Sequence, residues 1–341
     1  MAADLRVGLM GYGVAGRIFH APLIESVAGL SLAAVVTRHD ERRAAVRERH
    51  PGARVLDSLD DLLASAPDVV VVATPNDTHA PFATACVEAG VPVVVDKPFA
   101  PSAAEARQVL KAAESAGVPV TVFQNRRWDG DYRTVRKLLG AGTLGAVHRF
   151  ESRWEFAADV DPDRVGGGLL SELGVHMIDQ AVQAFGSVRE VYAELAARRP
   201  GAVVDDDAFV SMTHVNGVVS QLWASAVAHG SGPRFRVLGD RACFTVEGMD
   251  GQEDALAAGV LPGSPGWGVA PEETWGRLSG PGGVTAVPTE PGSYEVFYQR
   301  LRTALREGGP LPVDPHSTVP ALEVIDAAVR SARSREVIAL S

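Results

Sequence analysis

The sequence predicts an α/β protein with an N-terminal doubly wound domain, followed by an α+β domain with a mostly antiparallel, open-faced sheet. Its 341 residues, 46% of them hydrophobic, suit two cores better than one. Up to about residue 121, short valine-rich runs alternate with helical stretches. From about residue 147 the hydrophobic pattern changes to a period of two, which is typical of an antiparallel sheet.

The strands of the first domain are expected where valine segments are nearly continuous, because such strands are covered on both faces. They are "LRVGLMG", "LSLAAVVT", "DVVVVAT", "VPVVVDK" and "PVTVFQN". The helices between them include "ATACVEAG" and "SAAEARQVLKAAESAG". We expect this domain to cover residues 1–121.

The second domain is expected over residues 122–341. It begins with the helical stretch "DYRTVRKLLGAG" and continues with the alternating runs "VHRFESRWEF", "DAFVSMTHV", "VVSQLWASAV" and "RFRVLG". Glycine and proline are frequent over 248–293, which predicts loops. A helix at about 317–333 and the short strand "EVIAL" close the chain.

Charge and cysteine content exclude several classes of protein. The formal net charge is -10 and no basic cluster is present, which argues against nucleic acid or an anionic membrane as partner. The two cysteines, Cys86 and Cys243, do not suggest a disulfide framework or a metal site. We see no signal peptide and no apolar run long enough to span a bilayer, so we expect a cytoplasmic protein.

A glycine motif, "GLMGYGVAGRIFHAP", lies between the first strand and the first helix. Gly11, Gly13 and Gly16 permit a tight turn and close backbone approach, so the amides that open the helix can face a pyrophosphate. The alternative is a tight turn without a ligand. The position of the motif in a βαβ unit favours a Rossmann dinucleotide site, to which Val14 and Ala15 also contribute.

The end of the second strand bears on the choice of cofactor. An acid that binds the ribose hydroxyls of NAD is usual there, whereas this sequence has Thr37 and Arg38. A hydroxyl and a guanidinium suit a 2′-phosphate, which favours NADP and leaves NAD open. The alternative is a surface loop of mixed charge.

Two later segments place polar residues at the carboxyl ends of parallel strands, the edge at which such sheets bind ligands. Thr74, Pro75 and Asn76 follow one valine run, and Lys97 follows the next. Lys97 is a candidate catalytic amine because it adjoins an apolar strand and a proline. Alternatively, it is a solvated lysine paired with Asp96.

A polar stripe runs along the predicted helix in "GGGLLSELGVHMIDQAVQAFG". Glu172, His176, Asp179 and Gln183 recur at spacings of four, three and four, so they share one face. This face is either solvated or lines a functional cleft. Glutamate and histidine could also bind zinc, but no third ligand is evident, and we expect no metal.

The chain resembles the glucose-fructose oxidoreductase, inositol dehydrogenase and rhizopine catabolism family, nearly from end to end. The resemblance rests on "GYGVAGRIFHAP", "TPNDTHAPFA", "DKPFAPS", "VFQNRRWDGDYRTV" and "GGGLLSELGVHMIDQ". Within the family, "GRIFHAP", "QNRRWD" and "GMDGQEDALAAGVLPGSPGWG" look like the NADP-dependent scyllo-inositol dehydrogenase branch.

The resemblance implies a role for each polar residue of the helix. It implies that the helix faces the nicotinamide cleft between the domains, with His176 as the acid/base residue and Lys97 as the lysine of the family's Glu-Lys-Pro motif. Asp179 matches an acid that binds substrate hydroxyls. Glu172 stands where the family usually has aspartate, and Asp96 where it usually has glutamate.

These observations predict an NADP-dependent oxidoreductase of a cyclitol or sugar alcohol, a small polyol ligand. The open alternatives are a reductase of another keto sugar, a dihydrodiol dehydrogenase, and a nonenzymatic NADP-binding regulator. The catalytic candidates are Lys97, His176 and Glu172. The cofactor candidates are Gly11, Gly13, Val14, Ala15, Gly16, Thr37, Arg38, Thr74, Pro75, Asn76, His79 and Lys97. The substrate candidates are Gln124, Asn125, Arg127 and Asp179.

The alternation in "VSQLWASAV" gives the second sheet two different faces. One face has Val219, Gln221, Trp223, Ser225 and Val227, and the other has Val218, Ser220, Leu222, Ala224 and Ala226. We expect a helix to cover one face and a second subunit to cover the other, as in the family, giving a homodimer or homotetramer. The alternative is that the segment 248–293 folds over the second face.

Overall fold

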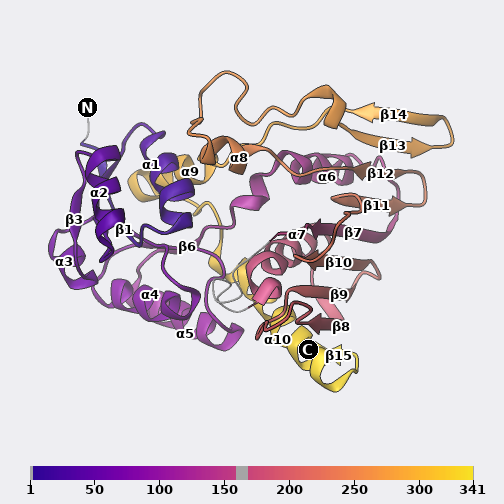
Figure 1. Cartoon of the computed structure of the whole chain (residues 1–341), viewed down its shortest axis with the longest axis horizontal. Helices are drawn as coiled ribbons and strands as arrows, with labels where there is room; N and C mark the ends of the chain where they lie inside the picture. The colour runs from indigo at the N-terminus through magenta and orange to yellow at the C-terminus, as the bar shows by residue number, and fades with distance from the viewer. Residues whose placement is uncertain (1–2, 159–167, 341) are drawn as a thin grey trace. The chain divides into compact units, whose positions relative to one another are not determined.

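The computed structural model describes residues 3–158 and 168–340, and Figure 1 traces the whole chain. The chain divides into two compact units. The first unit comprises Met1–Asn125, Gln252–Trp267 and Ser293–Thr318, and the second comprises Arg126–Gly251, Gly268–Gly292 and Val319–Ser341. The segments Gln252–Trp267 and Ser293–Thr318 therefore belong to the first unit, although they follow most of the second unit in the sequence. A single domain boundary in the sequence does not describe this division.

The first unit contains a six-stranded sheet with the order β3-β2-β1-β4-β5-β6, and all of its pairings are parallel. Its strands are β1 Leu5–Met10, β2 Leu30–Val36, β3 Arg54–Leu56, β4 Val69–Val72, β5 Val93–Val95 and β6 Val120–Val122. The doubly wound, Rossmann-like sheet and the five expected strands are confirmed. The sequence reading missed β3, which has three residues and no valine run.

The helices of the first unit follow the expected alternation with strands. They are η1 Ala15–His20, α1 Ala21–Glu25, α2 Asp40–Arg49, α3 Leu59–Ala64, η2 Asn76–Thr78, α4 His79–Glu88, α5 Ala103–Ala116, α8 Gln252–Ala257, α9 Glu295–Glu307 and η7 Pro315–Thr318. The Ser102 side chain caps α5 by accepting the Glu105 backbone N–H, and Gly117 ends the helix in the left-handed region. Every residue of β4 is 0% exposed, because the central strands are covered on both faces.

The second unit contains a nine-stranded sheet with the order β14-β13-β12-β11-β7-β10-β9-β8-β15. Its strands are β7 Val147–Glu155, β8 Val188–Ala196, β9 Asp207–His214, β10 Val219–Ser225, β11 Phe235–Gly239, β12 Cys243–Val246, β13 Gly276–Gly280, β14 Gly283–Val287 and β15 Ile338–Ala339. β7 and β10 pair in parallel, and the other pairs are antiparallel. The expectation of a mostly antiparallel sheet is confirmed.

Helices cover one face of this sheet, as expected from the alternation along β10. The helical segments of the unit are η3 Asn125–Trp128, which begins at the last residue of the first unit, and α6 Gly130–Gly140, η5 Leu170–Gly174, α7 Val175–Phe185, η6 Glu272–Thr274 and α10 Val319–Ser334. α7 contacts β10 and α10 contacts β8. Ser220 and Leu222, on the covered face, are at most 2% exposed.

The other face of the sheet carries larger and more exposed side chains. Trp223 is half-buried. The Arg153 guanidinium lies 4.0 Å from its ring centroid, and the Phe209 ring lies 5.2 Å away. The two faces therefore differ in side-chain size, as the sequence predicts.

The expectation of loops throughout 248–293 is wrong. The helix α8 begins at Gln252, and β13 and β14 form a hairpin that extends the sheet beyond β12. Glycine marks the turn and the close packing here, since a Cβ at Gly276 would lie 2.3 Å from the Phe244 ring. The glycine and proline content of this segment predicted its turns correctly, but it did not indicate the short strands β13 and β14 between them. No described helix is long and apolar enough to cross a membrane.

Candidate active site

The glycine loop after β1 is shaped by backbone contacts. A Cβ at Gly11, whose φ is +103°, would lie 2.3 Å from the Ala73 carbonyl oxygen, and a Cβ at Gly16 would lie 2.3 Å from the Gly11 carbonyl oxygen. Both positions therefore need glycine to close the turn. At Gly13 the nearest atom would be 4.0 Å away, so this position leaves space in which a phosphate can approach the backbone.

A second arginine lies near this loop. The atom nearest to a Cβ at Gly13 would be Arg42 Nη1, and Arg42 belongs to α2. Thr37 is buried, and its carbonyl accepts Arg43 Nη1 at 3.1 Å, whereas Arg38 is exposed at the end of β2. The sequence analysis singled out Arg38 and missed Arg42, although its place in the first turn of the following helix was a usable signal.

The loop after β4 is tied to the loop after β5 by His79. Its Nδ1 lies 2.7 Å from the Pro98 carbonyl oxygen and its Nε2 lies 2.8 Å from the Thr74 carbonyl oxygen. The Thr74 hydroxyl also bonds the Thr78 hydroxyl at 2.6 Å. His79 thus holds the loop after β4 against the loop after β5. The binding of a cofactor by His79, Thr74, Pro75 and Asn76 stays a prediction.

Lys97 is half-buried and follows β5 by two residues. Its backbone N–H donates to Asp96 Oδ1 at 2.8 Å, and a buried histidine, His20, lies 3.7 Å from the same oxygen. Burial alone would raise the pKa of Asp96, but the nearby His20, Lys97 and His79 side chains outweigh it and lower the pKa. A carboxylate therefore adjoins the predicted catalytic amine.

Two substrate candidates, Gln124 and Asn125, follow β6 in the first unit. They are 2% and 5% exposed. The Gln124 backbone N–H bonds the Val122 carbonyl oxygen at 2.9 Å, which makes a tight turn at the end of the strand. Their role in substrate binding stays a prediction.

In the second unit, Asp205 anchors the start of the polar helix. Its carboxylate accepts the Leu170 N–H at 2.8 Å, and its carbonyl accepts the Leu169 N–H at 2.9 Å. Glu172 lies in η5, a π-helical segment, and His176 lies in the first turn of α7. Such a segment widens the turn between two predicted catalytic residues, and π-helical turns are frequent at functional sites.

His176 is 4% exposed, so this part of the stripe is not a solvated face. Its ring lies 6.1 Å from the ring of Trp154 on β7, with 31° between the planes. The Arg126 guanidinium lies 4.4 Å from the Trp154 ring centroid. An aromatic side chain and a cation thus pack near the predicted acid/base residue, and the sequence analysis named neither of them.

Arg127 and Asp179, two substrate candidates, form a two-pronged ion pair. Arg127 Nε lies 2.8 Å from Asp179 Oδ2 and Nη2 lies 2.6 Å from Oδ1. The side chains are 14% and 2% exposed, so the pair is held in a largely desolvated setting. The structure brings these two residues together, which the sequence analysis did not foresee.

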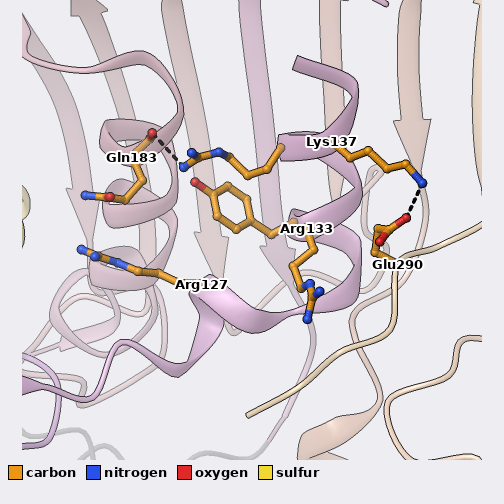
Figure 2. A pocket seen from close by; sticks show the side chains of 7 residues that line it. Arg127, Arg133, Lys137, Gln183 and Glu290 are labelled. Carbon is orange, nitrogen blue, oxygen red and sulfur yellow. Dashed lines mark hydrogen bonds and ion pairs between the residues drawn. The ribbon is translucent and has the colours of Figure 1, made fainter. Parts of the chain in front are cut away.

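A cavity of about 310 Å³ in the second unit is lined in part by Arg127, and Figure 2 shows the side chains around it. Its described lining consists of Arg127, Tyr132, Arg133, Arg136, Lys137, Gln183 and Glu290. Arg136 Nη1 donates to the Gln183 carbonyl oxygen at 3.0 Å, and Lys137 pairs with Glu290 at 2.5 Å. Guanidinium and amide donors around a cavity suit a ligand rich in oxygen atoms.

Comparison with known protein families shows to which family the chain is related. Residues 5–124 match the oxidoreductase family's NAD-binding Rossmann fold, and residues 136–340 match its C-terminal alpha/beta domain. The chain belongs to the Gfo/Idh/MocA oxidoreductase family. The described part of the chain contains no group of three metal-ligating side chains.

Relatives within the Gfo/Idh/MocA family extend over the whole chain. The NADP-dependent scyllo-inositol 2-dehydrogenase IolW of Bacillus subtilis is 30% identical over 352 residues, covering 98% of this chain and 96% of the relative. The uncharacterized oxidoreductase YdgJ of Escherichia coli is 35% identical and covers 100% of both. Among solved structures, the oxidoreductase YvaA of Bacillus subtilis has a TM-score of 0.94 at 30% identity, with 99% of each chain covered.

Proposed function

We propose that this protein is an NADP-dependent dehydrogenase or reductase that interconverts a secondary alcohol and a ketone on a cyclitol or sugar, as scyllo-inositol dehydrogenase does. The observation that carries the proposal is the end-to-end likeness to a scyllo-inositol 2-dehydrogenase that uses NADP. The local structure supports it with a dinucleotide loop in one unit and a buried histidine on α7 in the other.

The residues of the first unit fit a nicotinamide dinucleotide. The glycine loop would hold the pyrophosphate, and Arg38 with Arg42 would bind the 2′-phosphate of NADP through charge-assisted hydrogen bonds. Thr74, Pro75 and Asn76 would line the nucleotide at the carboxyl end of β4. When bound, the nicotinamide supplies the carbon that accepts or donates the hydride.

The proposed proton chemistry belongs to side chains of the chain itself. In the oxidation direction, His176 takes the proton of the substrate hydroxyl as general base. The Lys97 ammonium stabilises the negative charge that develops on that oxygen, and it acts strongly where water is excluded. Glu172 orients His176, and the Arg127–Asp179 pair binds a neighbouring hydroxyl through the carboxylate lone pairs that the guanidinium leaves open.

A screen of cofactor reduction tests the proposal. Purified protein is incubated with NADP or NAD and a panel of inositols, aldoses, deoxy sugars and trans-dihydrodiols. We expect the fastest reduction with NADP and an inositol. Faster turnover of a dihydrodiol or a deoxy sugar would reassign the substrate, and tight NADP binding without turnover of any compound would favour a regulator.

We also propose that the exposed face of the second sheet binds a second copy of the chain. Support comes from Trp223 and Phe209, whose ring centroids lie 5.2 Å apart at a tilt of 42° on the face that α7 and α10 do not cover. β13 and β14 lengthen the sheet. Light scattering at micromolar concentration should give at least twice the mass of 35.9 kDa, and a mass equal to one chain would refute this assembly.

A further inference from the structure

A chain of polar side chains runs through the interior of the first unit and ends beside Lys97. The Tyr298 hydroxyl lies 2.6 Å from His20 Nδ1, and His20 Nε2 lies 3.7 Å from Asp96 Oδ1. The same carboxylate oxygen accepts the Lys97 backbone N–H at 2.8 Å. The chain therefore ends on the peptide group of a predicted catalytic residue.

Burial favours one direction for the hydrogen bond between Tyr298 and His20. Tyr298 and His20 are both 0% exposed. Burial, and then the charge of Asp96, raises the pKa of Tyr298 well above its usual value, so the hydroxyl keeps its proton. A buried hydroxyl that keeps its proton needs an acceptor, and His20 Nδ1, 2.6 Å away, can accept it in the neutral tautomer with its proton on Nε2. The ring proton of His20 then lies on Nε2, which faces Asp96.

The Asp96 carboxylate needs donors because its side chain is 10% exposed. The Lys97 backbone N–H bonds one carboxylate oxygen at 2.8 Å, and His20 Nε2 makes a longer electrostatic contact with the same oxygen at 3.7 Å. The His20 ring is itself fixed on its apolar side, since its centroid lies 4.4 Å from that of Phe123. Together these contacts restrict the rotamer of Asp96 and the position of the Lys97 peptide.

We propose that His20 and Tyr298 are positioning residues, which hold the Asp96 carboxylate and through it the backbone of Lys97 at the carboxyl end of β5. The role in turnover rests on the proposed function, because that function places Lys97 in the reaction. The positions themselves link two segments of the sequence, "GRIFHAP" and "DKPF", to helix α9, which carries Tyr298.

The first unit also contains a matched control. The Tyr12 hydroxyl lies 2.8 Å from His50 Nε2, and His50 Nδ1 lies 2.9 Å from Glu25 Oε1. This second chain also joins a tyrosine, a histidine and a carboxylate, but through the opposite ring nitrogens. It runs from Tyr12 in the glycine loop to Glu25, the last residue of α1, and does not include Lys97. Substitution of His50 therefore reports what the loss of a buried histidine does in itself.

Glutamine and asparagine substitutions of His20 distinguish the role of Nε2 from the role of Nδ1. The glutamine amide can replace the Nε2–H donor of histidine, whereas the shorter asparagine amide reaches only the Nδ1 position. We expect His20→Asn to lower kcat about tenfold and His20→Gln to stay within about threefold, with NADPH affinity within about twofold in both. His50→Asn and His50→Gln should not reproduce the difference in kcat between the two His20 variants.

A second readout does not need a substrate. Lys97 is acylated with an amine-reactive reagent over a range of pH, and the modified peptide is quantified by mass spectrometry. We expect His20→Asn and Tyr298→Phe to change the rate at Lys97, and His20→Gln to restore the rate of the unsubstituted protein. If no polyol is turned over, the proposed function fails while this readout still decides the positioning. Equal rates at Lys97 in His20→Asn and His20→Gln would overturn the inference. The same difference between His50→Asn and His50→Gln as between the two His20 variants would also overturn it.

Discussion

In the first unit, the residues predicted to bind the cofactor lie in loops at the carboxyl ends of strands. In the second unit, three of the residues predicted to act on the substrate, Glu172, His176 and Asp179, lie along one helical stretch. The loops are shaped by the backbone, as at Gly11 and Gly16. The helix depends on side-chain partners, as in the ion pair of Asp179 with Arg127. The comparison teaches that substitutions in the two units should affect different steps.

The largest effect is expected for the two predicted catalytic residues, one from each unit. His176→Ala and Lys97→Ala should each lower kcat at least about a hundredfold with NADPH binding retained, because the proposed function has each side chain act in the transition state. Steady-state kinetics and a fluorescence titration with NADPH measure the two quantities. His148→Ala and Lys111→Ala, at exposed positions, are the controls. Normal turnover by His176→Ala would refute its assignment.

The ion pair on α7 should affect substrate binding and not cofactor binding. Asp179→Asn leaves the guanidinium of Arg127 without its carboxylate in a largely buried setting. We expect KM for the polyol to rise about tenfold to a hundredfold, with the Kd of NADPH within about twofold. Asp207→Asn is the matched control, because it breaks the more exposed pair with Arg198. An equal change in both variants would contradict a role in the site.

Cofactor choice is expected to depend on the end of β2 in the first unit. Arg38→Ala should weaken the binding of NADPH by about 1 to 3 kcal/mol and leave the binding of NADH nearly unchanged, because the proposed function pairs this guanidinium with the 2′-phosphate. Arg42→Ala tests the second guanidinium beside Gly13 in the same way. Arg47→Ala, later in α2, should change neither affinity. Calorimetric titration decides, and an equal loss for both cofactors with Arg38→Ala would remove the basis for NADP preference.

How far the sequence predicted the fold depended on the length of each pattern. The long valine runs placed five strands of the first sheet, whereas β3, with three residues, was missed. Composition predicted loops where β13 and β14 lie, because their glycines mask a short alternating pattern.

For the candidate site, the sequence predicted which residues to consider but not which side chains contact one another. Motif spacing singled out Lys97, His176 and Asp179. It could not show that Arg127 holds Asp179 or that Trp154 packs near His176. Partners from distant parts of the chain leave no periodic signal in the sequence. His20 was quoted inside a motif, but its contact with Tyr298, 278 residues away, depends on the tertiary structure.

The smallest effect is expected on stability, from a histidine of the second unit outside the proposed site. Burial lowers the pKa of His214 below its usual value of 6.5. The unfolded chain therefore binds more protons near that pH, so stability is full above about pH 6.5 and falls as the pH decreases below it, by at most about 1.4 kcal/mol per pH unit. His214→Gln should flatten this dependence of the thermal midpoint. Substitution of the exposed His316 by glutamine should leave this pH dependence unchanged. An unchanged pH dependence in His214→Gln would contradict the attribution of the effect to His214.

The most direct test of the central claim follows the transferred atom. scyllo-Inositol deuterated at its ring carbons is incubated with the protein and NADP, and the reduced cofactor is analysed by mass spectrometry. The proposed reaction moves the carbon-bound hydrogen to C4 of the nicotinamide, so deuterium should appear in NADPH, and His176→Ala should slow its appearance at least about a hundredfold. Bound NADP that gains no deuterium from this or any other deuterated polyol would contradict the assignment of this chain as a polyol dehydrogenase.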